Sequence, residues 1–402
     1  MMSKILFLTF DIRYINPTRE LLLKALGAAC DLDLFGPGFQ NGSELDRGPQ
    51  AYLDRHGPYD LVLADEFVLQ DFHKAQRGAI LRFVNHACSF DRDLFMYGER
   101  FKEFLSTYSG RKGIFLSQTD YYCFPQHRLD LVEGIFDYVF GWGEELIAPR
   151  NVVISEEAGQ PVLSPVDREV LSRWTDRYRN FLLAHPERII SMPHLIDDAE
   201  FSDRQLRGRK PWVVIGADYT ERMNARAALD MAGIMRTGKA QPYLFSMFQK
   251  FHINPYAHSW SIDILQRQFK LALVRAKYAY TCGAIVRCAI RKYFEIPAAG
   301  CVLVADRCEG FEALGFRDRH NALLAKGSEV LDAHRWLSEL DDAGQGIANQ
   351  GRDLIRQQHS ISARGRQLSA AFEAISSGRF AGSKWVDGKF MLRLTDGTAL
   401  PV

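Results

Sequence analysis

Short apolar runs alternate with segments of helical periodicity along the first half of the chain. Residues 4–9 form an uninterrupted apolar run, which is typical of a strand buried on both faces of a parallel sheet. Pro17 favours the first turn of a helix and opens a periodic segment that reaches Leu26. The same patterns predict strands at residues 32–35, 59–64, 113–117 and 138–140, and helices at residues 74–84, 94–105 and 166–183.

A second series of strands and helices follows a polar linker at residues 197–210, and the strand predicted at residues 188–196 ends the first series. The second series comprises predicted strands at 212–218, 276–281 and 301–305, helices at 222–233, 261–276 and within 330–376, and a hairpin around Asp396-Gly397. Alternating strands and helices favour the α/β class. We therefore expect two Rossmann-like, doubly wound domains facing a cleft, residues 1–195 and 196–375, and a C-terminal tail with a hairpin, residues 376–402.

In an open α/β sheet, ligands bind beyond the carboxyl ends of the strands. Several polar residues and one glycine follow predicted strands of the first domain and are expected near one rim of its sheet: Asp11, Asp65, Glu66, Asp120 and Gly141.

The segment that joins the last two predicted strands of the second domain carries the clearest chemical pattern. Gly283 lies at a predicted strand-to-helix turn, where a glycine allows close backbone approach and a helix N-terminus attracts an anion. Arg287, Arg291 and Glu295 recur at intervals of four, so in a helix they share one face. Two cations and one carboxylate suit a sugar nucleotide, with the cations on phosphate and the carboxylate on ribose. The alternative is a surface helix with an Arg291–Glu295 ion pair.

Composition narrows the classes of function. Lys plus Arg, 50 residues, nearly balance 49 Asp plus Glu, so no global field attracts nucleic acid or an anionic membrane. Seven cysteines never form C-x-x-C, which indicates reduced thiols of a cytosolic protein without a zinc site. The apolar run at the N-terminus is too short for a signal peptide, and no stretch is long enough to span a membrane. We expect a cytoplasmic protein without a nucleic-acid partner.

Residues 291–306, RKYFEIPAAGCVLVAD, resemble the R-x-F-E-x-x-A-x-G signature of glycosyltransferases group 1, which are GT-B enzymes, and among them the CgeB-like branch. Three further segments agree in order and spacing. Residues 216–222, GADYTER, resemble the first strand and loop of the donor domain, residues 192–201 the interdomain P-x-x-x-D-x-x-x-F segment, and residues 358–364 the H-[ST]-x-x-x-R helix start. The resemblance covers residues 190–375 and implies a GT-B fold.

The resemblance assigns Glu295 to the nucleotide ribose, because retaining GT-B enzymes hold a carboxylate at this position. Those enzymes often carry a second Glu eight positions upstream, where this chain has Arg287. Whether the reaction retains or inverts the anomeric configuration therefore stays open. An arginine at this position can instead neutralise the charge of the diphosphate.

The diphosphate itself is assigned to Arg222 and Arg291, helped by the backbone at Cys282 and Gly283 and by the following helix N-terminus. Tyr219 is expected to border the donor pocket. Structural alternatives are a solvated helix position for Arg222 and core packing for Tyr219.

Asp120 is the first catalytic candidate, because related enzymes often place a His or Asp after the corresponding strand, near the anomeric carbon of the donor. If the reaction inverts, Asp120 can take the proton of the acceptor hydroxyl. Asp11 is the second candidate, and turn capping is the structural alternative for both. The D-x-D tripeptides at residues 31–33 and 91–93 match the number that composition predicts by chance, so we expect no metal and no other cofactor.

The resemblance thus implies a metal-independent glycosyltransferase of bacterial surface polysaccharide assembly. It would move a sugar from a nucleotide-sugar donor to a hydroxyl of a glycan or lipid-linked acceptor. Alternatives are a GT-B sugar-nucleotide epimerase and a catalytically silent binding or structural protein. Residues 94–112 could form a surface helix that touches a membrane-held acceptor, with core packing as the alternative. The expected membrane contact is at most peripheral, at the inner face.

Overall fold

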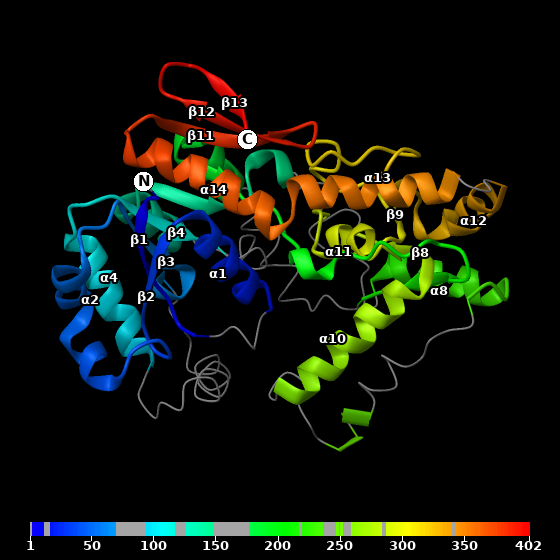
Figure 1. The fold of residues 1–402 in the computed structure, drawn as a ribbon, viewed down its shortest axis with the longest axis horizontal. Coiled ribbons are helices and arrows are strands. Elements are labelled where there is room, and N and C mark those ends of the chain that lie inside the picture. Colours follow the sequence, from blue (N-terminus) through cyan, green and yellow to red (C-terminus); the bar gives the residue numbers. More distant parts are fainter. Residues whose placement is uncertain are drawn as a thin grey trace.

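The computed structural model describes residues 2–11, 17–69, 94–116, 126–147, 177–216, 219–235, 247–248, 250–251, 259–283, 287–339 and 343–402. Two α/β lobes lie side by side, and the last helix and a small antiparallel sheet lie over the N-terminal lobe (Figure 1). The helix predicted at residues 74–84 and the candidate Asp120 lie outside the described residues.

The N-terminal lobe is built on a six-stranded parallel sheet in the order β2-β1-β3-β4-β5-β6. Its strands are β1 (Lys4–Leu8), β2 (Asp31–Phe35), β3 (Leu61–Asp65), β4 (Lys112–Phe115), β5 (Tyr138–Gly141) and β6 (Ile189–Ser191). Its helices are α1 (Pro17–Ala29), α2 (Gly42–His56), α4 (Leu94–Thr107) and α5 (Gln126–Ile135), with 3₁₀ turns η1 (Glu66–Leu69), η3 (Glu144–Leu146) and η4 (Pro186–Arg188). In β1, Ile5 stands opposite both Leu32 and Leu61. The strand order reverses between β1 and β3, as a doubly wound sheet requires.

Helix α2 was not predicted, because its sequence lacks a continuous helical pattern. Asn41 caps the helix, since its side chain accepts a hydrogen bond from the Glu44 backbone N–H at 3.0 Å. Gly48 then leaves helical geometry with a φ of 83°, and Pro49 follows it. A glycine and a proline in mid-segment break the periodic signal, so the sequence predicted no helix between the strands at residues 32–35 and 59–64.

Helix α4 settles one of the alternatives left open by the sequence. Its aromatic side chains Tyr97, Phe101 and Phe104 are buried together with Leu105. The apolar face of the helix therefore packs in the core of the lobe and is not a membrane-facing surface.

The C-terminal lobe contains a four-stranded parallel sheet in the order β10-β9-β8-β7. Its strands are β7 (Lys210–Val214), β8 (Ala276–Thr281), β9 (Val302–Ala305) and β10 (Leu323–Leu324). Its helices are α8 (Thr220–Met231), α10 (Ser259–Val274), α11 (Lys292–Ala298), α12 (Val330–Glu339) and α13 (Ala343–Gln358), with η6 (Gly327–Glu329). Among the described strands of this lobe the order follows the chain, so the reversal is seen only in the N-terminal lobe.

The C-terminal segment returns to the N-terminal lobe. Helix α14 (Ile361–Ser376) packs along α1, and β11 (Phe380–Val386), β12 (Lys389–Leu394) and β13 (Ala399–Pro401) form a three-stranded antiparallel sheet. The predicted hairpin is present as β12 and β13. Trp385 of β11 is buried, and its indole N–H donates to the carbonyl of Ser191 at 3.1 Å. The tail is therefore part of the body of the N-terminal lobe.

The chain passes between the lobes twice, near Ile196 and near residues 359–361, and these two segments are hydrogen-bonded to each other. The Ile196 N–H donates to the His359 carbonyl at 2.9 Å, and the Ile361 N–H donates to the Ile196 carbonyl at 3.0 Å. The 3₁₀ turn η5 (Asp198–Glu200) follows the first crossing, and Lys24 of α1 pairs with Asp197 at 2.7 Å. Because both crossings share backbone hydrogen bonds, the joint holds the two sheets in one relative position.

A buried arginine lies at this joint. Arg364, in the first turn of α14, is almost fully buried, and none of its three guanidinium nitrogens has a hydrogen-bond partner among the described residues. Its guanidinium lies 5.6 Å from the ring centroid of Trp385. Burial lowers the pKa of Arg364 to about 9, so the group still carries its charge at pH 7. A buried charge without a counter-ion costs several kcal/mol, of which a cation–π contact returns about 2.

We predict that Arg364→Met stabilises the protein by about 1 kcal/mol, because methionine fills the site without a charge. Thermal unfolding at pH 7 should show a melting temperature raised by about 2 °C. Arg366→Met is the matched control, since Arg366 is exposed on the same helix and its replacement should change little. A clear loss of stability specific to Arg364→Met would mean that the guanidinium has a stabilising partner, and would contradict this interpretation.

Candidate functional site

The carboxyl ends of β7 and β8 bring a first group of predicted site residues together. Arg222 of α8 is buried, and its guanidinium donates to the Thr281 hydroxyl at 3.3 Å and to the Cys282 carbonyl at 3.2 Å. The same guanidinium lies 4.9 Å from the ring centroid of Tyr219, which precedes the helix. Arg222 is thus fixed at the end of the sheet, and a solvated helix position is excluded.

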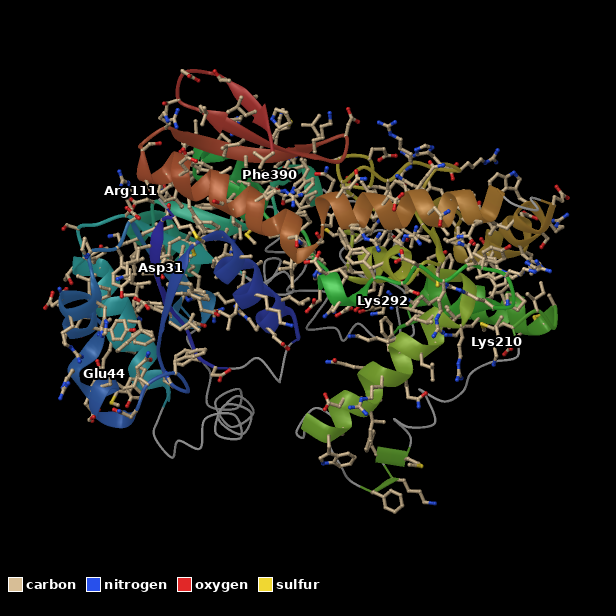
Figure 2. All side chains as sticks on the ribbon, in the orientation of Figure 1. Asp31, Glu44, Arg111, Lys210, Lys292 and Phe390 are labelled. Atoms are coloured by element: carbon tan, nitrogen blue, oxygen red, sulfur yellow. The ribbon has the colours of Figure 1, made fainter. Side chains whose placement is uncertain are left out.

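Lys292, which the sequence did not single out, lies beside Arg222. A side chain on Gly216 would meet Arg222 Nη1 at 2.5 Å and Lys292 Cε at 2.8 Å, so both cationic side chains approach the same point over this glycine. Gly216 has a φ of 111°, which a residue with a side chain rarely adopts. Figure 2 labels Lys292 on the side of the C-terminal lobe that faces the N-terminal lobe.

Lys292 has no ion-pair partner in the described part of the chain, and its ammonium lies 5.8 Å from the ring centroid of Phe269. Burial is the main cause that lowers its pKa; Glu295 raises that pKa, whereas Arg222 and Arg291 lower it. The arrangement is therefore a pair of neighbouring cations, partly withdrawn from water, at the place where parallel sheets bind ligands.

Gly283 has a structural role in the segment that follows β8. Its backbone N–H donates to Asp306 Oδ1 at 2.9 Å, and the Tyr293 hydroxyl donates to the same oxygen at 2.7 Å. Burial raises the pKa of Asp306, which these two hydrogen bonds lower. A side chain on Gly283 would meet Arg287 Cα at 2.9 Å and Cys308 Cβ at 3.1 Å. The glycine is thus required for backbone packing, and its N–H is bound within the protein.

The helix predicted to begin at Gly283 was misplaced. Helix α11 begins at Lys292, and residues 287–291 are not helical. Arg287 has a φ of 52°, and its carbonyl accepts a hydrogen bond from the Glu309 N–H at 2.7 Å. Arg287 therefore does not share a helix face with Arg291 and Glu295. The local signal failed because a spacing of four residues fits a helix but does not require one.

Arg291 and Glu295 form the ion pair that was the alternative interpretation. Arg291 Nε lies 2.9 Å from Glu295 Oε1, with the two side chains 18% and 12% exposed. Arg291 also lies 3.5 Å from Glu200 of η5, which pairs with Lys270 of α10 at 3.3 Å. Burial raises the pKa of Glu295, and Arg291 lowers it. Both residues thus belong to a charge network beside the interlobe linker.

In the N-terminal lobe the acids at the end of β3 are already engaged. Arg19 of α1 pairs with Asp65, and with Glu66 at 3.0 Å, and all three side chains are buried. Thr9 Oγ1 also donates to Asp65 at 3.1 Å. Asp11 is half-buried, and its N–H donates to the Pro37 carbonyl at 2.9 Å. Asp65 and Glu66 therefore stabilise the fold, and Asp11 stays a candidate.

The ends of the two sheets meet at the junction between the lobes. His194, which follows β6, lies edge-on to Trp142 at 6.2 Å and to Phe294 of α11 at 6.1 Å between ring centroids. A side chain on Gly310, after β9, would meet Leu146 at 2.7 Å. Burial lowers the pKa of His194 to about 3, with further lowering by nearby cations, so its ring is neutral at pH 7.

Two of the D-x-D acids have a structural explanation. Asp31 and Asp33 lie on β2, and the Tyr59 hydroxyl donates to Asp33 at 2.6 Å. Within the described ranges, no three His, Cys, Asp or Glu side chains gather as metal ligands would. No described helix is long and apolar enough to cross a membrane.

Comparison with known proteins finds one similar family and several similar folds. Residues 272–370 match the family described as glycosyl transferase-like. No curated protein matches the chain. Among solved structures, HepE from Anabaena in complex with UDP is 11% identical, with 92% of this chain and 100% of that chain covered and a TM-score of 0.50. Sucrose-phosphate synthase from Thermosynechococcus elongatus is 10% identical over 94% and 100%, with a TM-score of 0.49.

The chain has the GT-B fold, and its residues 272–370 are similar to the glycosyl transferase-like family. The predicted fold and the resemblance to group 1 glycosyltransferases are thereby confirmed, and the CgeB-like branch stays a prediction. Neither comparison favours the epimerase or the silent protein.

Sequence reasoning missed Lys292 because it does not fall on the interval of four that picked out Arg287, Arg291 and Glu295. Only the fold shows that Lys292 lies beside Gly216 and Arg222, which are far from it in the sequence. No local pattern could have indicated that contact.

We predict that Gly216→Ala lowers stability, because the added methyl would displace Arg222 and Lys292 and the positive φ adds strain. Gly208→Ala is the matched control, since Gly208 has a φ of 79° and nothing within 4 Å of an added Cβ. Thermal unfolding should show Gly216→Ala about 1–3 kcal/mol less stable than the control variant. Equal stability of the two variants would contradict the crowded geometry over Gly216.

Proposed function

We propose that this protein is a glycosyltransferase that moves a sugar from a nucleoside diphosphate donor to a hydroxyl of a glycan or lipid-linked acceptor. The observation that carries the proposal is the pair of cations Arg222 and Lys292, which converge over Gly216 at the carboxyl ends of β7 and β8. The glycosyl transferase-like domain includes Lys292 and the end of β8. Assembly of bacterial surface polysaccharide is the setting that the resemblance suggests.

The diphosphate of the donor is the ligand that this pair of cations suits. Like charges held close together repel each other, and more strongly where water is partly excluded. A diphosphate between them would replace that repulsion with attraction and would favour the charged form of Lys292. The fold neighbour HepE was solved with UDP, so a UDP-sugar is the first donor to test.

The chemical step needs a stable leaving group and an acceptor for one proton. The bond between the anomeric carbon and the donor phosphate breaks, and a bond from that carbon to the acceptor oxygen forms. Arg222 and Lys292 would stabilise the negative charge that develops on the leaving diphosphate. The proton of the acceptor hydroxyl needs a base; Asp120 is our first candidate and Asp11 the second. Retention or inversion is left to product analysis.

The other donor contacts are proposed from the resemblance. Glu295 would accept hydrogen bonds from the ribose hydroxyls. Its carboxylate would then be shared between the ribose and Arg291. Arg291 and Arg287 would add positive charge near the diphosphate, and the Cys282–Gly283 backbone and Tyr219 would line the donor side. No metal is part of this proposal, because two protein cations can take its electrostatic role. We propose a cytoplasmic enzyme with no nucleic-acid partner.

Lys292→Met should abolish most of the stabilisation by UDP while leaving the unliganded protein at least as stable. Loss of a charge-assisted contact to phosphate weakens binding about 10- to 100-fold, whereas removal of a partly buried, unpaired charge favours the folded state. Melting temperatures with and without UDP measure both effects, because ligand binding to the native state raises the melting temperature.

The lowered pKa of Lys292 also predicts a pH dependence of stability. Between that pKa and 10.5 the unfolded chain binds this proton more readily than the folded protein, so the stability of the wild-type protein rises with pH. The Lys292→Met variant should lack this rise.

Lys210→Met is the control, because Lys210 is exposed at the opposite end of β7 (Figure 2). It should leave the UDP-dependent shift unchanged. If Lys292→Met keeps the full shift, the diphosphate binds elsewhere. If neither UDP nor any other nucleoside diphosphate stabilises the wild-type protein, the donor proposal fails altogether.

A further inference from the structure

Helix α10 stands apart from the rest of the C-terminal lobe. In Figure 1 the C-terminal end of the helix meets the sheet and the rest extends well beyond α8 and α11, with the short segments at residues 247–248 and 250–251 beside its far end. The buried side of the helix includes Leu265 and Leu273. One side of a 16-residue helix therefore packs on the lobe, and another faces outward.

The outward side carries an apolar stripe. Trp260 is 49% exposed, and Ile264 and Leu271 are each 38% exposed. Their spacing of four and seven residues places all three within about 40° of one another around the helix axis. At the far end, Phe251 is 64% exposed, and the ring of the neighbouring Phe248 lies 5.8 Å from that of Trp260. Exposed tryptophan and phenylalanine gathered at one tip are unusual for a solvated surface.

Cations border this stripe. Arg267 lies within it, and Lys250 and Lys270 flank it, all three exposed; Asp263 is the exposed acid on the same helix. Lys270 also reaches Glu200 of the interlobe linker at 3.3 Å. Aromatic and aliphatic residues mixed with cations on one helix face are the pattern of helices that lie in the headgroup region of an anionic membrane.

The opposite side of α10 contacts the candidate donor site. Phe269, one turn before the end of α10, is the residue whose ring faces the ammonium of Lys292 at 5.8 Å. The outward face of the helix and the candidate site are therefore joined through a single helix. A second copy of the chain is a poorer occupant of this face, because the cations there outnumber the single acid Asp263, so two such faces repel each other.

We propose that Phe251 and the outward face of α10 dock on the surface of an anionic lipid membrane and so bring the catalytic junction to a membrane-held acceptor. The docking itself stands independently, and only the delivery of the acceptor rests on the proposed function. This surface is not the one suggested by residues 94–112, where Tyr97, Phe101 and Phe104 are buried in the core. Trp260 and Phe251 would enter the headgroup region, while Lys250 and Arg267 would contact lipid phosphates.

The test is co-sedimentation of the full chain with vesicles of phosphatidylcholine alone or mixed with phosphatidylglycerol. We expect binding to the anionic vesicles at least tenfold tighter than to the neutral ones, and weaker at high salt. Trp260→Ser combined with Phe251→Ser should reduce binding at least fivefold, and so should Lys250→Ser combined with Arg267→Ser. Leu183→Ser is the control, because Leu183 is 51% exposed on the N-terminal lobe and should leave binding unchanged.

Melting temperatures with and without UDP verify folding and test the donor site separately, since neither double variant alters Arg222 or Lys292. If the protein binds vesicles but UDP does not raise its melting temperature, the docking proposal stands and the proposed function fails. The docking proposal would be overturned if the protein bound no vesicles, or if Leu183→Ser reduced binding as much as the double variants. It would also be overturned if the protein formed a concentration-dependent dimer that the Trp260 and Phe251 substitutions dissociate.

Discussion

The missing side chain at Gly216 is the constraint on which the candidate site depends. Only a glycine leaves room for Arg222 and Lys292 to approach the same point, and only a glycine adopts its backbone conformation readily. The protein thereby holds two like charges together at the end of a parallel sheet. Two neighbouring like charges destabilise the unliganded protein, and a bound anion would offset their repulsion.

The position of the two lobes supports the same interpretation. The crossings at Ile196 and His359 share backbone hydrogen bonds, so the chain leaves and re-enters the N-terminal lobe at one joint. Helix α14 and the tail sheet then pack back on that lobe, with Trp385 bonded to Ser191. His194 lies directly beyond the joint, against Phe294 of the other lobe. The joint therefore places the end of the first sheet opposite the cation pair of the second.

Much of the fold could be predicted because its signals are local. The buried run at β1 and the later apolar runs gave the strands, and their alternation with helices gave the two lobes. The candidate site was predicted less well, because it depends on side chains that meet from separate elements. Arg222, Tyr219 and Cys282 do come together, whereas Arg287 lies off the helix whose start was misplaced. No local pattern links Arg19 to Asp65 and Glu66, which lie 46 and 47 residues further along the chain, or shows that Lys292 lies beside Gly216.

A crystal structure of the protein with UDP tests the central claim most directly. We predict that the diphosphate lies over Gly216, with an oxygen within hydrogen-bond distance of Lys292 Nζ and another near the guanidinium of Arg222. A nucleotide bound with its phosphates at the β1–β3 end of the N-terminal sheet, away from both cations, would contradict the account.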